Sequence, residues 1–425
     1  MIHKLTISLK QHTPLIHFQH DQDGATLRAS EVKPKLDRFI LNKLSSEERA
    51  KGLEEGWIKK KNEKVWLDYR IKIEKTNVVT WDFSRDTGRL DQNRRPIIEQ
   101  MPLFFGNMHR RDDVNFVPKK MTFCHTPIKI SFFSISDTLI KKITDGLYSF
   151  FLLNNFGTRQ SKGFGSFMPE TSNVSEILPC SHAKFNWDLP NETQFGDWGC
   201  FYDLFTAIDL FYKTLRSGLN QNNVYLKSLM YFYALDVGEY WDKRTIRYEF
   251  RHFTPNREND RGEQADMKND GNHSKDIARL YRDMLGLSSV QTWRKYDNDV
   301  ITKDHVTDCP NNKIDRFKSP ILIKPIYHNG KFDVLLIPSI IPNAYLNADF
   351  TISSNNRRQS FQMRTPTSFD TDDFLQYITD DNVVEFIVGE INEILYNAEQ
   401  ERRSKAKKIA KTLLSIFNNI KYVKK

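Results

Sequence analysis

Cysteine is scarce in this sequence. Its 425 residues include four cysteines, Cys124, Cys180, Cys200 and Cys309, which lie far apart and form no CxxC or Cys/His ligand pair. This spacing argues against a zinc ribbon or zinc finger. So few cysteines in so long a chain are typical of a protein of the reducing cytoplasm, which is the location that we expect.

Long apolar runs are missing as well. No segment approaches the ~18 apolar residues of a membrane span, and the first residues, MIHKLTISLKQHTPL, are polar where a signal peptide needs a continuous apolar stretch. The phosphate-binding pattern GxxxxGK[ST] is absent, which disfavours a nucleotide site. We therefore expect a soluble protein with no cofactor, no bound metal and no membrane partner.

The formal net charge of +9 favours a polyanionic partner, but the charge is unevenly distributed. Nine Lys or Arg residues and one acid fall between Glu401 and Lys425, so the rest of the chain is almost neutral. A nucleic-acid surface elsewhere must arise from local clusters of cations. The last segment also reads as a basic amphipathic helix, which packs on its own domain or contacts RNA through Arg402, Arg403, Lys405, Lys407 and Lys408.

The length exceeds that of a usual single domain, and the pattern of the chain suggests two α+β domains, residues 1–185 and 186–425. In the first, alternating or apolar runs predict strands, and helical spacing predicts a helix capped by Ser30 and a second one over 136–154. The predicted order is strand, helix, strands, strand, helix, final strand, which we interpret as the β-α-β-β-α-β order of a ferredoxin-like domain. The expected strands are 2–10, 65–75, 78–83 and 127–135, with a last one after residue 166.

The second half is expected to be more helical. Helices are predicted over 198–216, 225–237 and 275–285, and residues 368–420 read as mostly helical. Two strand-like runs flank Asn329-Gly330, which is the best hairpin signal in the chain. A second ferredoxin-like unit with helical insertions fits this pattern.

A glycine-rich segment at residues 157–166, GTRQSKGFGS, is the most informative motif. Glycine lets a backbone approach a ligand closely, and the amides of such a loop can cradle phosphate oxygens without reading base identity. A structural hairpin with two solvated cations explains the same pattern. The candidate binding residues are Gly157, Thr158, Arg159, Gln160, Ser161, Lys162, Gly163 and Gly165.

A second basic segment, LRASEVKPKLDR at residues 27–38, lies where a loop meets the start of a helix. Free amides and the helix dipole favour phosphate at such a place. The candidate binding residues here are Arg28, Ser30, Lys33 and Lys35. A helix with an exposed charged face is the simpler interpretation.

These segments resemble the RAMP proteins of type III CRISPR effectors, and most closely the first subunit of the Cmr-type (III-B) complex. The resemblance is carried by HTPLI at the end of the first strand, LRASEVKPKLDRF, the loop GTRQSKGFGSF, and RFKSPILIKP at residues 316–325. A middle segment, LRSGLNQ at 215–221, is also similar to the second half of that subunit.

The resemblance implies two tandem ferredoxin-like, RRM-related domains. It also implies a non-catalytic subunit that binds the guide RNA (crRNA) backbone near its 3′ region in antiviral defence. The implied partners are guide RNA and other RAMP subunits of the complex, with target RNA as a further possible one. Arg316 and Lys318 join the candidate RNA-binding residues on this basis.

Two other functions stay open. His17 and His20 lie in the first loop, and a metal-independent ribonuclease needs a base near the attacking 2′-OH, so a guide-RNA-processing endoribonuclease is the alternative. A protein-only scaffold without RNA contact is the other. The large number of aromatic residues makes Phe164, Phe167 and Trp81 more typical of a core than of base stacking.

Overall fold

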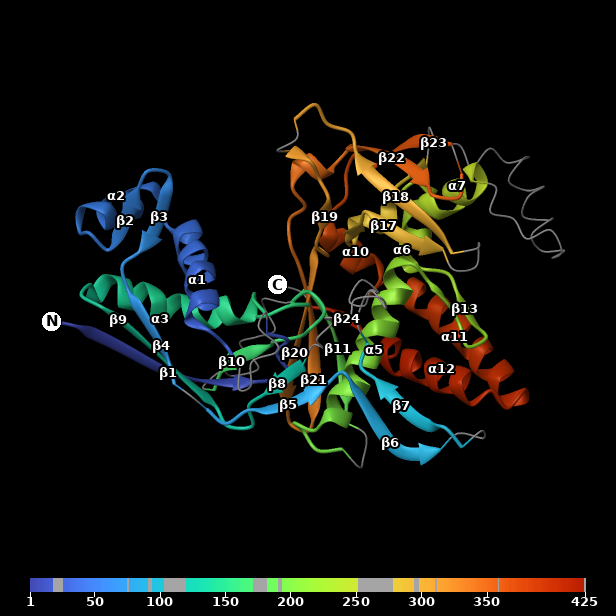
Figure 1. Ribbon diagram of the computed structural model, residues 1–425, viewed down its shortest axis with the longest axis horizontal. Helices are drawn as coiled ribbons and strands as arrows, with labels where there is room; N and C mark the ends of the chain where they lie inside the picture. Colours follow the sequence, from blue (N-terminus) through green and yellow to red (C-terminus); the bar gives the residue numbers. More distant parts are fainter. Residues whose placement is uncertain are drawn as a thin grey trace. The chain divides into compact units, whose positions relative to one another are not determined.

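The computed structural model describes residues 1–17, 26–74, 76–90, 94–102, 120–170, 182–189, 193–250, 278–293, 298–309, 312–357 and 359–423 (Figure 1). The chain forms two compact units. The first consists of Met1–Asp209, Leu322–Ile337 and Asn419–Lys425, and the second of Leu210–Ile321 and Pro338–Asn418. Both contain helices and strands, so the fold belongs to the α+β class, as predicted.

The first unit contains all the described strands that precede the glycine-rich segment. Its elements are β1 (His3–Gln11), α1 (Ala29–Lys43), α2 (Ser46–Glu54), β2 (Ile58–Lys61), β3 (Lys64–Leu67), β4 (Arg70–Ile73), β5 (Val79–Asp82), β6 (Ser84–Leu90), β7 (Pro96–Gln100), β8 (Lys120–Phe123), β9 (Ile128–Ser134), α3 (Asp137–Leu152), β10 (Phe167–Pro169), β11 (Ala183–Asp188), β20 (Ile321–His328), β21 (Lys331–Pro338), β24 (Lys421–Tyr422) and the start of α5 (Trp198–Arg216).

Four of these strands form an antiparallel sheet in the order β10-β1-β9-β4. Along the chain they occur as β1, α1, β4, β9, α3 and β10, which is the predicted order except that the predicted strand 78–83, β5, pairs with β8 in a separate two-stranded sheet. The hairpin β2–β3 with α2 follows α1, and the ribbons β5–β8 and β6–β7 lie between β4 and β9 in the sequence.

Helices α1 and α3 cover one face of this sheet (Figure 1). The predicted helix 136–154 is confirmed: Ser136 caps α3 by accepting a hydrogen bond from the Leu139 amide at 3.2 Å. Leu139, Ile143, Leu147 and Phe150 recur at helical spacing and are buried, because they share the face turned to the sheet.

A second antiparallel sheet of the first unit has the order β20-β21-β11-β24. The turn between β20 and β21 is Asn329-Gly330, with φ of 48° and 81°. Positive φ at both central residues is what a tight hairpin turn requires, and Asn and Gly tolerate it best. The predicted hairpin is therefore confirmed.

The second unit surrounds a six-stranded sheet with the order β14-β15-β23-β22-β18-β17. Its elements are β12 (Leu219–Gln221), β13 (Val224–Leu226), α6 (Leu229–Asp236), β14 (Tyr240–Trp241), α7 (Asp242–Glu249), β15 (Ala278–Arg279), α9 (Tyr281–Met284), β16 (Leu287–Ser288), β17 (Val290–Trp293), β18 (Asp299–His305), β19 (Arg316–Phe317), the 3-10 helix η3 (Asn343–Tyr345), β22 (Asp349–Ser354), β23 (Ser360–Arg364), α10 (Thr371–Tyr377), α11 (Asp381–Gln400) and α12 (Ser404–Phe417), with the end of α5.

Several sequence predictions need correction. The run 65–75 is not one strand: it divides into β3 and β4, which pair in different sheets. The predicted helix 225–237 begins only at Leu229, because residues 224–226 form a strand with β12. Within the predicted helix 275–285, the described residues are helical only over Tyr281–Met284.

The C-terminal basic helix, α12, packs within its own unit. Ile409, Leu413, Ile416 and Phe417 are buried on one face, and α12 packs against α11. Two of its candidate RNA-binding cations pair with acids: Arg403 with Glu401, and Lys407 Nζ with Glu399 Oε1 at 2.8 Å. The interpretation of this segment as a docked helix is confirmed.

Candidate nucleic-acid interface

The start of α1 is set by Arg28. This residue is extended, with φ −115° and ψ 142°, and its carbonyl accepts hydrogen bonds from the amides of Glu31 and Val32, each at 3.0 Å. The prediction that Ser30 is the N-cap is therefore wrong: Ser30 lies in the first turn and is exposed. The Arg28 side chain makes no capping hydrogen bond, and the first amides of an α-helix have no partner within the helix.

The glycine-rich segment depends on its glycines for packing. Gly157 and Gly165 have φ of 77° and 68°. A β-carbon at Gly157 would lie 2.5 Å from the carbonyl oxygen of Ile16, and one at Gly165 would lie 2.0 Å from that of Phe156. Real β-carbons do not approach carbonyl oxygens so closely, so both positions require glycine whatever the loop binds.

The segment HTPLI holds one side of this loop. The amides of Thr158 and Gly165 donate to the carbonyls of Ile16 and Pro14 at 2.9 and 2.8 Å. Thr13 Oγ1 donates to the Gly163 carbonyl at 2.6 Å and accepts from the Ser166 amide at 2.9 Å. Two of the four stretches that carry the family resemblance are thus joined directly.

Glu31 and Lys35 join the loop to α1. Glu31 Oε1 accepts a hydrogen bond from the Gly157 amide at 2.7 Å. Lys35 Nζ donates to Glu31 Oε1 at 3.2 Å, to the Asn155 carbonyl at 3.0 Å and to Gln160 Oε1 at 3.0 Å. The structure therefore brings together the two segments that sequence analysis singled out.

Residues of strand β20 form hydrogen bonds with the glycine-rich loop and its two ends. Lys324 Nζ donates to the carbonyls of Asn154 and Phe167 at 3.0 and 3.1 Å, at the two ends of the loop. Burial, and secondarily the charge of Lys35, lowers the pKa of Lys324 well below its usual value. Ser166 Oγ donates to the Pro325 carbonyl at 2.7 Å, and Asn155 Nδ2 to the Ile323 carbonyl at 2.9 Å. Sequence analysis missed Lys324, although a lysine inside the apolar run ILIKPIYH was a usable signal.

The loop residues differ in their solvent exposure. Thr158, Arg159, Gln160 and Ser161 are half-buried, as is Arg28 across the junction. Burial lowers the pKa of the Arg159 guanidinium, which still leaves it charged at neutral pH. Lys162 is only 5% exposed, and the three glycines are buried. The accessible part of the loop is therefore its tip, residues 158–161.

Lys33 is engaged elsewhere in the first unit. Its ammonium group donates to Asp37 Oδ2 at 3.0 Å and to the Leu67 carbonyl at 2.8 Å, and it lies 4.0 Å from the centroid of the Tyr69 ring. These contacts direct Lys33 toward β3 and away from the hydrogen bonds that link Lys35 to the loop.

The other candidate residues belong to the second unit, are buried, or lie outside the described residues. Arg316 and Lys318 are exposed in the second unit, at and just after β19. His17 is 3% exposed, which is unfavourable for a base that must reach a substrate 2′-OH, and His20 lies outside the described residues. Phe164 and Phe167 are fully buried, and Trp81 stacks on Phe123, in accord with core roles.

Two further features concern only the described part of the chain. No group of three or more His, Cys, Asp or Glu side chains is placed there to hold a metal ion. Among its helices, none combines the length and the apolar character that a membrane span needs.

Comparison with known proteins identifies the family. Residues 2–219 match the Cmr1 N-terminal domain, and residues 225–408 match the Cmr1 C-terminal domain. No curated protein matches the chain. Because the two family matches together cover nearly the whole chain, it belongs to the Cmr1 family, the Cmr1-type RAMP proteins that are subunits of the Cmr (type III-B) CRISPR complex.

Proposed function

We propose that this Cmr1-family chain is a non-catalytic, cytoplasmic subunit that holds the backbone of the guide RNA near its 3′ region. One observation carries the proposal: the start of α1 and the tip of the glycine-rich loop lie side by side, joined through Glu31, Lys35 and the Gly157 amide. Arg28 and Ser30 come from one side of this junction, and residues 158–161 come from the other.

The chemistry of the junction suits phosphodiesters. Arg28 and Arg159 supply charge, and the start of α1, which the Arg28 side chain does not cap, supplies amides and the positive end of a helix dipole. Ser161 supplies a hydroxyl that can bind phosphate or ribose oxygens. The Thr158 hydroxyl is buried, and the Gln160 side chain is bonded to the Gly157 carbonyl at 2.6 Å and to Lys35 at 3.0 Å, so these two residues shape the loop. Because these groups suit backbone oxygens, we expect binding that depends on the backbone and is tolerant of sequence.

The remaining candidates take supporting roles in this proposal. Lys35 neutralises Glu31, which would otherwise repel a phosphate at the centre of the junction. Lys33 adds positive charge nearby, while the buried Lys162 and the glycines shape the loop. Arg316 and Lys318, exposed on the second unit, are proposed as further RNA contacts.

We also propose that the chain contains two ferredoxin-like domains, with a boundary near residue 185. The order β10-β1-β9-β4 with α1 and α3 supports the first. The second is supported by β11, α5, β20, β21, α12 and β24, which follow one another as strand, helix, two strands, helix, strand. Their sheet order β20-β21-β11-β24 repeats that of the first sheet in reverse. Residues 217–320 and 339–403 are then insertions, and exposed surfaces of both domains are available to neighbouring RAMP subunits and target RNA.

Photo-crosslinking tests the proposal. Guide RNA carrying 4-thiouridine near its 3′ end would be irradiated in the presence of the full chain, and the crosslinked peptides would be identified by mass spectrometry. We expect crosslinks to peptides that contain residues 28–30 or 158–161. Crosslinks confined to other peptides would refute the assignment of this junction to guide RNA.

A further inference from the structure

The open face of the sheet β10-β1-β9-β4, opposite α1 and α3, has an unusual composition. Side chains alternate between the two faces of a strand. Leu5, Ile7 and Phe132 point to the helices and join the core, so the residues between them point to the other face. The open face carries Lys4, Thr6, Ser8, Arg70, Lys72, Lys129, Ser131 and Phe133.

The register of the sheet sets an aromatic ring between two cations. Phe133 of β9 is paired with Lys4 of β1 on one side and with Arg70 of β4 on the other. Residues directly opposite each other have Cβ atoms about 5 Å apart. Lys4 Nζ lies 5.7 Å from the centroid of the ring. Phe133 is half-buried, whereas Lys4 and Arg70 are exposed.

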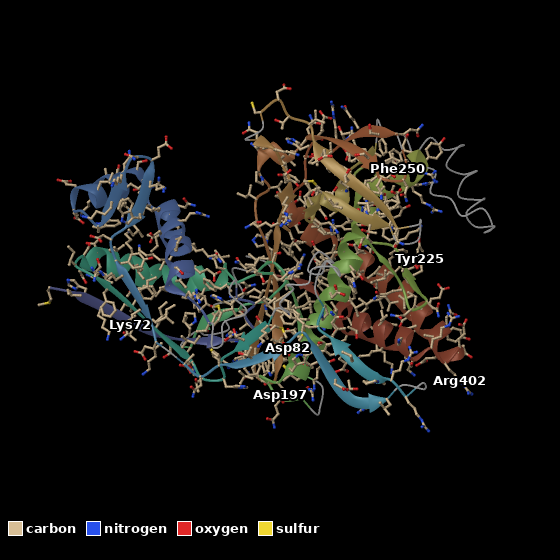
Figure 2. The ribbon with its side chains drawn as sticks, viewed as in Figure 1. Lys72, Asp82, Asp197, Tyr225, Phe250 and Arg402 are labelled. Atoms are coloured by element: carbon tan, nitrogen blue, oxygen red, sulfur yellow. The ribbon has the colours of Figure 1, made fainter. Side chains whose placement is uncertain are left out.

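The next two rows of paired residues also carry cations and hydroxyl groups. Ser131 is paired with Thr6 and with Lys72, and Thr6 Oγ1 lies 2.9 Å from Ser131 Oγ. Lys129 is paired with Ser8 one row further on. Lys72, labelled in Figure 2, and Lys129 are both exposed. Of the described acids, Glu74 follows β4 beside Lys129, and Glu170 follows β10 beside Ser8, so this face carries four exposed cations with two carboxylates at its edges.

We infer that this face binds single-stranded RNA, with a base stacked on Phe133 and neighbouring phosphates held by Lys4, Arg70 and Lys72. A flat sheet with an accessible ring suits an unpaired base, whereas the bases of a duplex are stacked on one another. Arg70 and Lys72 are two residues apart, about 7 Å along the strand, so they reach successive phosphates. The inference rests on the proposed RNA-binding function but concerns a different surface from the α1–loop junction.

An acidic partner protein is the rival occupant. Cations alone suit such a partner equally well, but the half-buried ring of Phe133 between Lys4 and Arg70 adds the stacking contact that single-stranded nucleic acid uses. The hydroxyls of Thr6 and Ser8 add groups that bind phosphate or the ribose 2′-OH.

The test is binding of fluorescein-labelled twelve-nucleotide oligouridine to the full chain, followed by fluorescence anisotropy. Phe133→Leu keeps an apolar side chain but removes the ring, and we expect affinity to fall about fivefold or more. Phe133→Tyr keeps the ring and should stay within about twofold of the unmodified chain. Lys4→Gln with Lys72→Gln, at exposed positions that do not threaten folding, should weaken binding and reduce its dependence on salt.

The matched control is Lys51→Gln with Lys141→Gln, which removes the same charge from α2 and α3, where these side chains are 69% and 74% exposed. The inference would be overturned if Phe133→Leu and the Lys4/Lys72 double variant both bind oligouridine as tightly as this control. A protein partner would then be the remaining candidate for this surface.

Arg159→Ala separates the two proposals. Weaker binding only in the open-face variants would support the open face and count against the α1–loop junction. Weaker binding only in Arg159→Ala would support the α1–loop junction and count against the open face. A 4-thiouridine crosslink to the β9 peptide that contains Phe133 is expected from the unmodified chain, and it does not depend on any variant folding correctly.

Discussion

The carboxylate of Glu31 accepts a hydrogen bond from the backbone amide of Gly157 at 2.7 Å, across 126 positions of sequence. The same oxygen lies 3.2 Å from Lys35 Nζ, so the ammonium group of Lys35 neutralises the carboxylate that holds the loop. This contact places a glycine-rich loop against the start of α1 and makes one junction from two distant segments.

Replacing Glu31 tests whether that contact holds the loop. Glu31→Ala removes the acceptor and leaves the Gly157 amide without its partner, so we expect the free energy of unfolding to fall by about 2 kcal/mol. Hydrogen exchange at Gly157 should become faster, while Glu31→Gln, which retains an acceptor oxygen, should have a smaller effect. Glu54→Ala, an exposed position on α2, is the control. Unchanged exchange at Gly157 in Glu31→Ala would show that the contact does not order the loop.

The loop glycines allow a comparison at matched backbone geometry. Gly165 and Gly88 both have φ of 68°, but a β-carbon at Gly165 would lie 2.0 Å from the Phe156 carbonyl oxygen, and one at Gly88 would meet nothing within 4 Å. Gly88→Ala should cost about 1 kcal/mol of stability through backbone strain. Gly165→Ala should cost at least about 3 kcal/mol, because steric overlap is added. Equal urea midpoints for the two variants would contradict the close packing of the loop.

His12 makes stability depend on pH. It is 4% exposed, and its Nδ1 accepts a hydrogen bond from the Tyr327 amide at 3.0 Å. Burial, and then the charges of Lys324, Lys10 and His328, holds the pKa of His12 well below its ordinary value of 6.5. The unfolded chain therefore binds a proton below about pH 6.5 that the folded chain does not, so stability must fall as the pH falls through this window.

We expect this loss of stability to approach about 1.4 kcal/mol per pH unit below 6.5, down to the folded-state pKa. Urea unfolding at a series of pH values would measure it. In His12→Asn, whose side-chain oxygen can accept from the Tyr327 amide, the dependence should be weaker. Parallel curves for the two proteins would exclude His12 as the origin.

Local sequence patterns correctly predicted the elements whose structure is determined by residues close to one another in the chain. The helix capped by Ser136 and the hairpin at Asn329-Gly330 follow from side-chain capping and from residues that tolerate positive φ, which neighbours in the sequence decide. The division of residues 65–75 into β3 and β4 was not predicted, because pairing with different partner strands produces it, and an apolar alternation does not record which strand is the partner.

The site was predictable only in part for the same reason. Sequence patterns singled out both segments of the junction, and the structure joins them. They could not show that Lys35 rather than Lys33 contacts the loop, since both lie in the same basic run and only the folded helix decides which side each faces. Nor could they place Lys324 beneath the loop, more than 150 positions away.

The most direct measurement is the affinity of the full chain for guide RNA over a range of NaCl concentrations, for the unmodified chain and for Arg159→Ala combined with Arg28→Ala. Each lost phosphate contact should reduce the slope of log K against log salt by about 1. We expect the double variant to bind more weakly and with a slope shallower by about 2 than that of the Lys51→Ala, Lys141→Ala control. A double variant with the affinity and slope of the control would contradict the assignment of the α1–loop junction to the RNA backbone.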